Sequence, residues 1–171
     1  MVPAELKEEL DAFVADLFRE DEIGSVIRAH IRIELLLNEL VEHLVPIPEY
    51  IKKLNLDYDG TLTLGLAMGL NPQFGPPLRS MGKLRNAFAH RLDKVLESND
   101  VNNLYSAMSQ PLKEQVQSSF TRIRSSNESI HQFKRFSDVP SRDQFKLMAI
   151  TLWAAFRVEV IRMKENGAAD A

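Results

Sequence analysis

Residues 23–45, IGSVIRAHIRIELLLNELVEHLV, decide the fold, because they combine a helical period with a high apolar content. Around residues 35–37 three consecutive leucines make the pattern apolar over much of the helix circumference. We therefore predict a central helix with neighbours on more than one side, ended by Pro46 and Pro48. Its apolar positions are Ile27, Ile31, Ile33, Leu35, Leu36, Leu37, Leu40, Val41 and Leu44.

Two more segments carry clear amphipathic patterns. Residues 4–20 place Leu6, Leu10, Phe13, Leu17 and Phe18 on one helix face. Near the other end, Ser141 and Gln144 have the spacing of a capping box. The stripe that follows predicts a long last helix, which Asn166 and Gly167 are expected to end. This stripe contains Phe145, Met148, Leu152, Trp153, Phe156, Val160 and Met163.

The middle of the chain has weaker signals. A short helix is predicted from residue 49 to residue 54, and a loop over residues 71–77. The stretch TLTLGLAMGL, residues 61–70, alternates as a strand would, but a single short strand would have no partner. We predict a helix there, with Gly65 and Gly69 allowing a close approach of helices.

The segment over residues 99–111 looks irregular, and residues 112–130 are polar enough for a mobile helix or a loop. Together the patterns predict an all-α fold, a bundle of five to seven helices. We expect residues 1–171 to form a single domain, with a less ordered region around residues 99–139.

The composition excludes several classes of protein. The 171 residues include no cysteine, which removes disulfides, thiolate metal sites and cysteine nucleophiles. The first residues, MVPAELKEEL, carry acids where a signal peptide has a basic region. No stretch approaches the roughly 18 apolar residues of a membrane span. We expect a cytoplasmic protein with no membrane partner.

The charge is unevenly distributed. Residues 1–60 hold 14 acids and 6 bases, and residues 61–171 hold 10 acids and 15 bases, for a total of −3. The basic part could face a polyanion, or the two parts could attract each other within one domain. The net negative charge argues against a protein that coats nucleic acid nonspecifically.

One predicted helix, residues 78–98, carries a set of residues suited to chemistry. Its apolar stripe consists of Met81, Leu84, Phe88, Leu92 and Val95. The opposite side presents Asn86, His90, Asp93 and Glu97, and Arg85 flanks the stripe with a side chain long enough to reach that polar side. Ala87 and Ala89 leave room for another chain or a ligand to approach.

The chemistry of Arg85, Asn86 and His90 fits a phosphodiester. A guanidinium binds phosphate oxygens through its fork of donors, and an imidazole transfers protons near neutral pH. An amide can fix the imidazole or a phosphate oxygen, and Asn86 and His90 lie one helical turn apart. We also consider Asp93, three residues beyond His90, as a group that orients the ring. No metal and no cofactor is required for this chemistry.

The motif Arg85-Asn86-x-x-x-His90 resembles the R-x(4–6)-H motif of the HEPN superfamily of small helical bundles. The wider stretch, with an aliphatic helix, the segment GLAMGL and then GKLRNAFAHRLD, is similar to the mannitol-operon-repressor-like (MltR-like) branch. The resemblance covers residues 23–97. One departure is Leu92, which stands where the nucleotidyltransferase-linked toxins of the superfamily carry a tyrosine.

The resemblance implies a metal-independent endoribonuclease of the toxin or defence type, which leaves a 2′,3′-cyclic phosphate at a composite homodimer site. Arg85 would then bind the phosphate, His90 would transfer the proton and Asn86 would orient them. RNA and an antitoxin or regulatory protein are the partners implied. The alternative is a non-catalytic MltR-like transcriptional regulator or protein-interaction module, which uses the same helix as a dimer or partner surface.

Weaker candidates lie outside this helix. His30 and Glu34 are spaced to share a metal, but two ligands are too few, so we interpret them as a surface pair. Arg28, Arg32 and Glu34 could instead supply polar partners for the motif helix. The stretch HQFKRF, residues 131–136, interleaves bases and aromatics as single-stranded nucleic-acid binders do, but Phe133 and Phe136 are better read as anchors onto the bundle.

Overall fold

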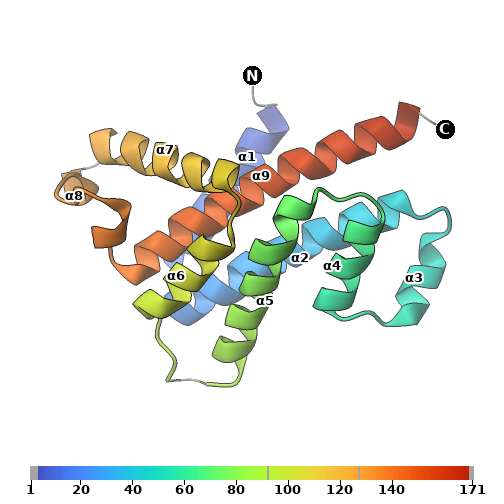
Figure 1. The fold of residues 1–171 in the computed structure, drawn as a ribbon, viewed down its shortest axis with the longest axis horizontal. Helices are drawn as coiled ribbons and strands as arrows, with labels where there is room; N and C mark the ends of the chain where they lie inside the picture. The colour runs from blue at the N-terminus through green and yellow to red at the C-terminus, as the bar shows by residue number, and fades with distance from the viewer. Residues whose placement is uncertain (1–3, 92, 127, 170–171) are drawn as a thin grey trace.

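The computed structural model describes residues 4–91, 93–126 and 128–169, and these residues form an all-helical fold without a strand (Figure 1). Eight α-helices have seven residues or more, beyond the five to seven expected, and α8 is a single turn. The helices are α1 (Ala4–Arg19), α2 (Glu22–Leu44), α3 (Pro48–Leu54), α4 (Tyr58–Ala67), α5 (Gly75–Ala89), α6 (Ser98–Ala107), α7 (Gln110–Ser126), α8 (Glu128–His131) and α9 (Ser141–Ala169), with 3-10 turns η1 (Pro72–Phe74) and η2 (Phe136–Asp138).

Helices α2 and α9 form the centre of the bundle and pack along each other. Helix α2 also contacts α1, α3, α4 and α5, which confirms the prediction of a central helix with neighbours on several sides. Helix α9 also contacts α1, α6 and α7. The two helices supply much of the centre of the core, including Ile33, Leu37, Leu40, Leu152 and Phe156, all with no exposed surface.

Ion pairs tie the basic C-terminal part of the chain to its acidic N-terminal part. Arg157 of α9 donates to Glu9 of α1 at 2.8 Å and to Glu39 of α2 at 3.2 Å. Lys164 adds a second cation to Glu39, 2.7 Å away. Attraction between the two parts within one domain, one of the two readings of the charge distribution, is therefore present in the fold.

Helix α5 lies on the near face of the molecule, in front of α2 and between α6 and α4 (Figure 1). Pro76 and Pro77 occupy its first turn, where their missing N–H groups cost nothing. Met81, Leu84 and Phe88 are buried and hold α5 against the core, as the stripe predicted.

The predicted end of this helix at residue 98 is wrong, because α5 ends at Ala89. A tertiary contact explains the early end. The N–H of Leu96 donates to the Glu22 carboxylate of α2 at 2.7 Å, and the Leu96 side chain is buried in the core. A continued helix could not make this contact. Val95, which the helical wheel placed in the apolar stripe, is 59% exposed, and Leu92 lies outside the described residues.

Three other local predictions are also corrected. The expected irregular segment at 99–111 contains α6, which begins with a capping box between Glu97 and Asp100 and buries Val101 and Leu104. Helix α9 continues through residues 166 and 167 to Ala169. Gly69 does not serve a close approach, because its φ of 103° places it in the left-handed turn that ends α4. The predicted helix over 61–70 is confirmed for residues 61–67, which belong to α4, while residues 68–70 form the turn that follows it.

Among the described residues no helix is long and apolar enough to cross a membrane.

At Gly82, helix α5 packs closely against the ring of Tyr58. A Cβ atom at Gly82 would lie 2.9 Å from the ring of Tyr58, closer than carbon atoms pack. By contrast, a Cβ atom at Gly65 would lie 3.5 Å from Leu37, an ordinary contact. The small residue at position 82 therefore sets the distance between α5 and the layer below it.

We predict that Gly82→Ala lowers the free energy of unfolding by about 1–3 kcal/mol, because the methyl group forces α5 and Tyr58 apart. Gly65→Ala is the matched control, and it should leave stability unchanged or raise it by up to about 1 kcal/mol through the better helix propensity of alanine. Urea unfolding of both variants measures the difference. Equal effects of the two substitutions would contradict the assigned role of Gly82.

Candidate functional site

The predicted motif lies at the C-terminal end of α5. Arg85 is half-buried, while Asn86 and His90 are exposed. The Arg85 side chain reaches round its own helix, and its guanidinium donates from Nη1 to Oδ1 of Asn86 at 2.9 Å. It thus reaches the polar side of the helix, as the helical spacing predicts. His90 forms the C-cap, with φ −100° and ψ −3°, so its ring stands at the end of the helix in solvent. The imidazole is therefore accessible and not sealed in the core.

The orienting role predicted for Asp93 rested on a helix that does not extend to it. Asp93 lies in the turn after α5, so the three-residue spacing from His90 no longer places the two side chains on one face. Glu97 is likewise outside α5 and instead serves as the N-cap of α6. The structure thus brings together Arg85 and Asn86, keeps His90 one turn away, and removes both acids from the polar face.

A buried layer of polar residues beneath the motif was missed. His30 of α2 is 1% exposed, its ring packs against that of Tyr58 at a tilt of 47° with centroids 4.4 Å apart, and its Nδ1 lies 3.7 Å from Glu34. Its Nε2 is buried without a hydrogen-bond partner among the described residues. The surface-pair interpretation of His30 is therefore wrong. The signal was available, since His30 shares the helix face of Val26 and Ile33.

Arg85 couples this buried layer to the motif. Burial, together with the positive charge of Arg85, lowers the pKa of His30 to about 4, so the ring is neutral near pH 7. Burial also raises the pKa of Tyr58 above its usual range, with a further contribution from Glu34, while Arg85 acts in the opposite direction. The phenol donates instead to the carbonyl of Leu78 at 3.0 Å, which fixes Tyr58 against α5.

Two cations on the polar face of α5 were also missed. Arg79 and Lys83 precede His90 by eleven and seven residues, spacings that place them on the same side of the helix as Asn86 and His90. Arg79 is paired with Asp59 at 2.9 Å and also donates to Thr63. Lys83 is exposed and no carboxylate of the described residues pairs with it. The helical spacing alone could have identified both.

A groove of about 570 Å³ runs beside this face, between α5 and α6. Lys83 and Ala87 lie on one side of it, and Asn103 and Asp100 on the other. The Asp100 carboxylate is neutralised by Lys94, 2.7 Å away. The polar face of α5 therefore presents donors and cations next to a space that an extended anionic chain could follow.

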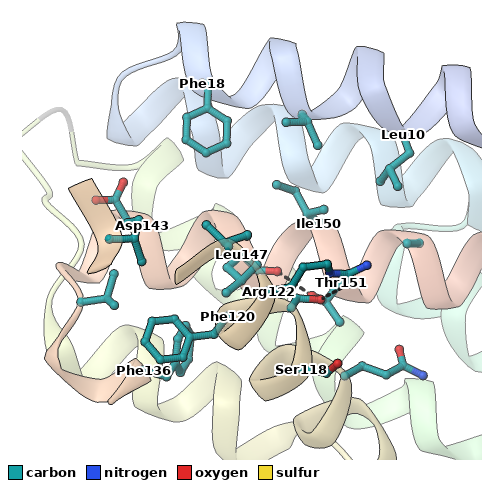
Figure 2. A pocket seen from close by; sticks show the side chains of 17 residues that line it. Leu10, Phe18, Ser118, Phe120, Arg122, Phe136, Asp143, Leu147, Ile150 and Thr151 are labelled. Carbon is teal, nitrogen blue, oxygen red and sulfur yellow. Dashed lines mark hydrogen bonds between the residues drawn. The ribbon is translucent and has the colours of Figure 1, made fainter. Parts of the chain in front are cut away.

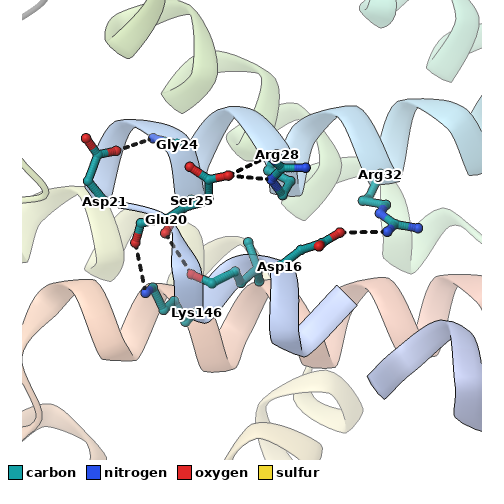
Figure 3. A network of polar contacts seen from close by, with 9 residues as sticks. Asp16, Glu20, Asp21, Gly24, Ser25, Arg28, Arg32 and Lys146 are labelled. Atoms are coloured by element: carbon teal, nitrogen blue, oxygen red, sulfur yellow. Dashed lines mark hydrogen bonds and ion pairs between the residues drawn. The ribbon is translucent and has the colours of Figure 1, made fainter. Parts of the chain in front are cut away.

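The two arginines of α2 considered as partners for the motif are committed elsewhere. Figure 3 shows them turned toward α1, where Arg28 pairs with Glu20 and Arg32 with Asp16, the latter at 2.8 Å. In the same network Lys146 of α9 donates to the carbonyl of Glu20. These contacts fix the turn between α1 and α2. Of Arg28, Arg32 and Glu34, which could supply polar partners for the motif, only Glu34 therefore stays on the side of α5.

The aromatic residues of the stretch 131–136 pack on the bundle, as expected. Phe136 is buried with its ring 5.9 Å from those of Tyr105 and Phe120, and Phe133 packs against the core. Arg135 forms an ion pair with Asp138 at 2.8 Å. This region therefore offers no stacking platform for bases.

Within the described ranges no group of three or more His, Asp or Glu side chains could hold a metal ion. Comparison of the chain with protein-family models, with curated proteins and with solved structures found no match. What the site can do chemically therefore depends on the groups that its own residues present. They offer a guanidinium, an amide and an accessible imidazole on one helix end, flanked by the free ammonium group of Lys83.

We predict that wild-type stability falls by about 2 kcal/mol between pH 7.5 and pH 5, because the unfolded state binds a proton at His30 that the folded state excludes. The stability contributed by the neutral ring is complete above pH 6.5 and is lost as the pH falls toward 4. His30→Phe, which keeps an aromatic ring against Tyr58, should remove most of this dependence. Urea unfolding at both pH values tests it, and an unchanged slope in the variant would contradict the assignment.

Proposed function

We propose that the chain is a HEPN-like protein that binds RNA, and that two copies form a metal-independent endoribonuclease. The observation that carries the proposal is the exposure of His90 one turn from the Arg85–Asn86 pair. An accessible imidazole and a positioned guanidinium are the groups that phosphodiester cleavage through a ribose hydroxyl requires. Lys83, on the same face, supports a polyanionic substrate.

The reaction needs both a base and an acid. The base removes the proton of the 2′-hydroxyl, whose oxygen attacks the adjacent phosphorus, and the acid protonates the departing 5′-oxygen. The products are a 2′,3′-cyclic phosphate and a 5′-hydroxyl. Each chain supplies one imidazole at this site, so two copies of His90 would fill the two roles, with Arg85 neutralising the phosphorane.

A second copy has a surface on which to dock. Ile31 and Leu35 stand one turn apart on α2 and are 47% and 59% exposed. Glu34, on the same face, is close enough to Tyr58 and His30 to border the Arg85 end of the motif. Burying these two side chains against their copies would remove apolar area from water and bring the two α5 helices toward each other.

We expect the purified protein to cut RNA in the presence of a chelator, with cyclic-phosphate ends. Arg85→Ala and His90→Ala should each lower the rate by about 10²–10⁴-fold, because each removes charge stabilisation or proton transfer. Circular dichroism checks that helicity is retained. His43→Ala, which changes an exposed histidine at the far end of α2, is the matched control. Cleavage that survives in both site variants would contradict the proposal.

The dimer has its own test. Leu35→Glu should convert the protein to a monomer and abolish cleavage, since each site would then lack its second imidazole. Leu54→Glu on α3 is matched in exposure, 60% against 59%, and should leave the mass and the activity unchanged. Light scattering reports the mass. A Leu35→Glu monomer that still cuts RNA at the wild-type rate would rule out a composite site.

The second candidate is a non-catalytic MltR-like transcriptional regulator or protein-interaction module. The observation that favours it is the apolar pair Ile31 and Leu35 beside a polar margin that contains Arg85, because an apolar centre with a polar rim is typical of protein interfaces. If the wild-type protein forms dimers but leaves every tested RNA intact, this candidate is preferred. A toxin or defence role is proposed only for the first candidate, the endoribonuclease.

A further inference from the structure

A second site lies away from α5, in a cavity of about 700 Å³ between α1 and α7 (Figure 2). Both helices pack on α9, which forms the floor through Leu147, Ile150 and Ala154. Figure 2 shows α1 along one side of the cavity and α7 along the other. The volume is in the range of pockets that hold small organic ligands.

The two walls of the cavity differ in chemistry. The wall from α1 is apolar and consists of Leu10, Val14 and Phe18. The wall from α7 presents an amide, two hydroxyls and a guanidinium over the same space, from Gln115, Ser118, Ser119 and Arg122. These four residues recur at helical spacing, so they form one continuous polar edge. A ligand that fits both walls must itself be amphipathic.

Apolar surface at the mouth of the cavity is left in water. Phe18 is 63% exposed and Ile123 is 37% exposed, although both line the cavity. Exposed apolar side chains that line a concave space are stabilised when an apolar group replaces the water. The floor and the α1 wall therefore favour a long hydrocarbon group.

The charges at the two ends of the cavity give the ligand a direction. Arg122 donates to Ser119 at 3.3 Å, and no carboxylate within the described ranges pairs with its guanidinium. Figure 2 shows Arg122 beside Thr151 over the floor, while Asp143 stands at the other end, past Leu147. The Asp143 carboxylate is paired with the Arg142 guanidinium at 3.7 Å. An anionic head is attracted to the Arg122 end, whereas the paired charges of Asp143 and Arg142 give the other end no comparable attraction.

We propose that this cavity binds a free aliphatic carboxylic acid of medium to long chain. The carboxylate accepts hydrogen bonds from the Arg122 guanidinium and the Ser119 hydroxyl, since a charge-assisted pair of this kind is stronger than a neutral one. The hydrocarbon tail lies between Phe18 and the α9 floor and extends toward Phe136. No residue of α5 takes part, so the inference is independent of the proposed function.

Isothermal titration calorimetry with ligands that share a tail tests the proposal. Decanoate should bind more tightly than decanol and decylamine, because only its head group complements Arg122. Butyrate should bind at least tenfold more weakly than decanoate, because it cannot fill the apolar part. Binding of decanol or decylamine as tight as that of decanoate, or equal binding of butyrate, would overturn the proposal, as would the absence of decanoate binding.

Substitutions at two exposed positions, Arg122 and Phe18, test where the ligand binds without destabilising the fold. Arg122→Gln should weaken decanoate binding roughly tenfold or more, through the loss of the charged partner, and leave decanol unchanged. Phe18→Ser should weaken decanoate and decanol alike. Arg124→Gln removes the same charge from the same helix outside the cavity and should have no effect. Equal effects of the two arginine substitutions would mean that net charge alone attracts the ligand, and would overturn the assigned site.

Discussion

The contact of α5 with α2 and α4 at Gly82 is the constraint on which the site depends. Because position 82 carries no side chain, the rings of Tyr58 and His30 fit directly under α5. The phenol then bonds to the backbone of α5, and Arg85 lies close enough to lower the pKa of the buried imidazole. The Arg85 guanidinium is held by its hydrogen bond to Asn86, and its closeness to the buried layer depends on the tight packing of α5. A wider separation of the helices would move Arg85 away from the imidazole and weaken the bond from Tyr58 to α5.

The helices that make the core could be predicted from the sequence, because their apolar period is set by burial on one side. The bounds of α1 and α2 and the start of α9 follow the periodicity closely, whereas the helix at α4 is predicted only because a single strand would have no partner. The end of α5 could not be predicted in this way. Its last predicted turns have helical spacing, but the chain leaves the helix and buries Leu96, whose N–H bonds to Glu22, 74 residues away in the sequence.

The candidate site, like the helices, could be predicted only where local periodicity places its residues. The side chains of Arg85, Asn86 and His90 lie on one short segment, so local periodicity was enough to place them. Asp93 failed because its role required the helix to continue. The surface interpretation of His30 is wrong because this polar residue lies on an apolar face of α2 and is buried with it. What the sequence could not supply is the packing of α4 across α5, which encloses that imidazole beside Tyr58.

The position of the motif at the end of α5 has a consequence for how it can hold a phosphate. The C-terminal end of a helix carries a partial negative charge and exposed carbonyls, which repel an anion. Backbone donors of the kind found at helix N-termini are therefore absent at His90. Any attraction for a phosphate has to come from side-chain cations, of which Arg85 and Lys83 are the two on the last turns of α5. In the proposed ribonuclease the arginine would therefore be needed to bind the phosphate, because the backbone at this end of α5 offers no donor that could replace it.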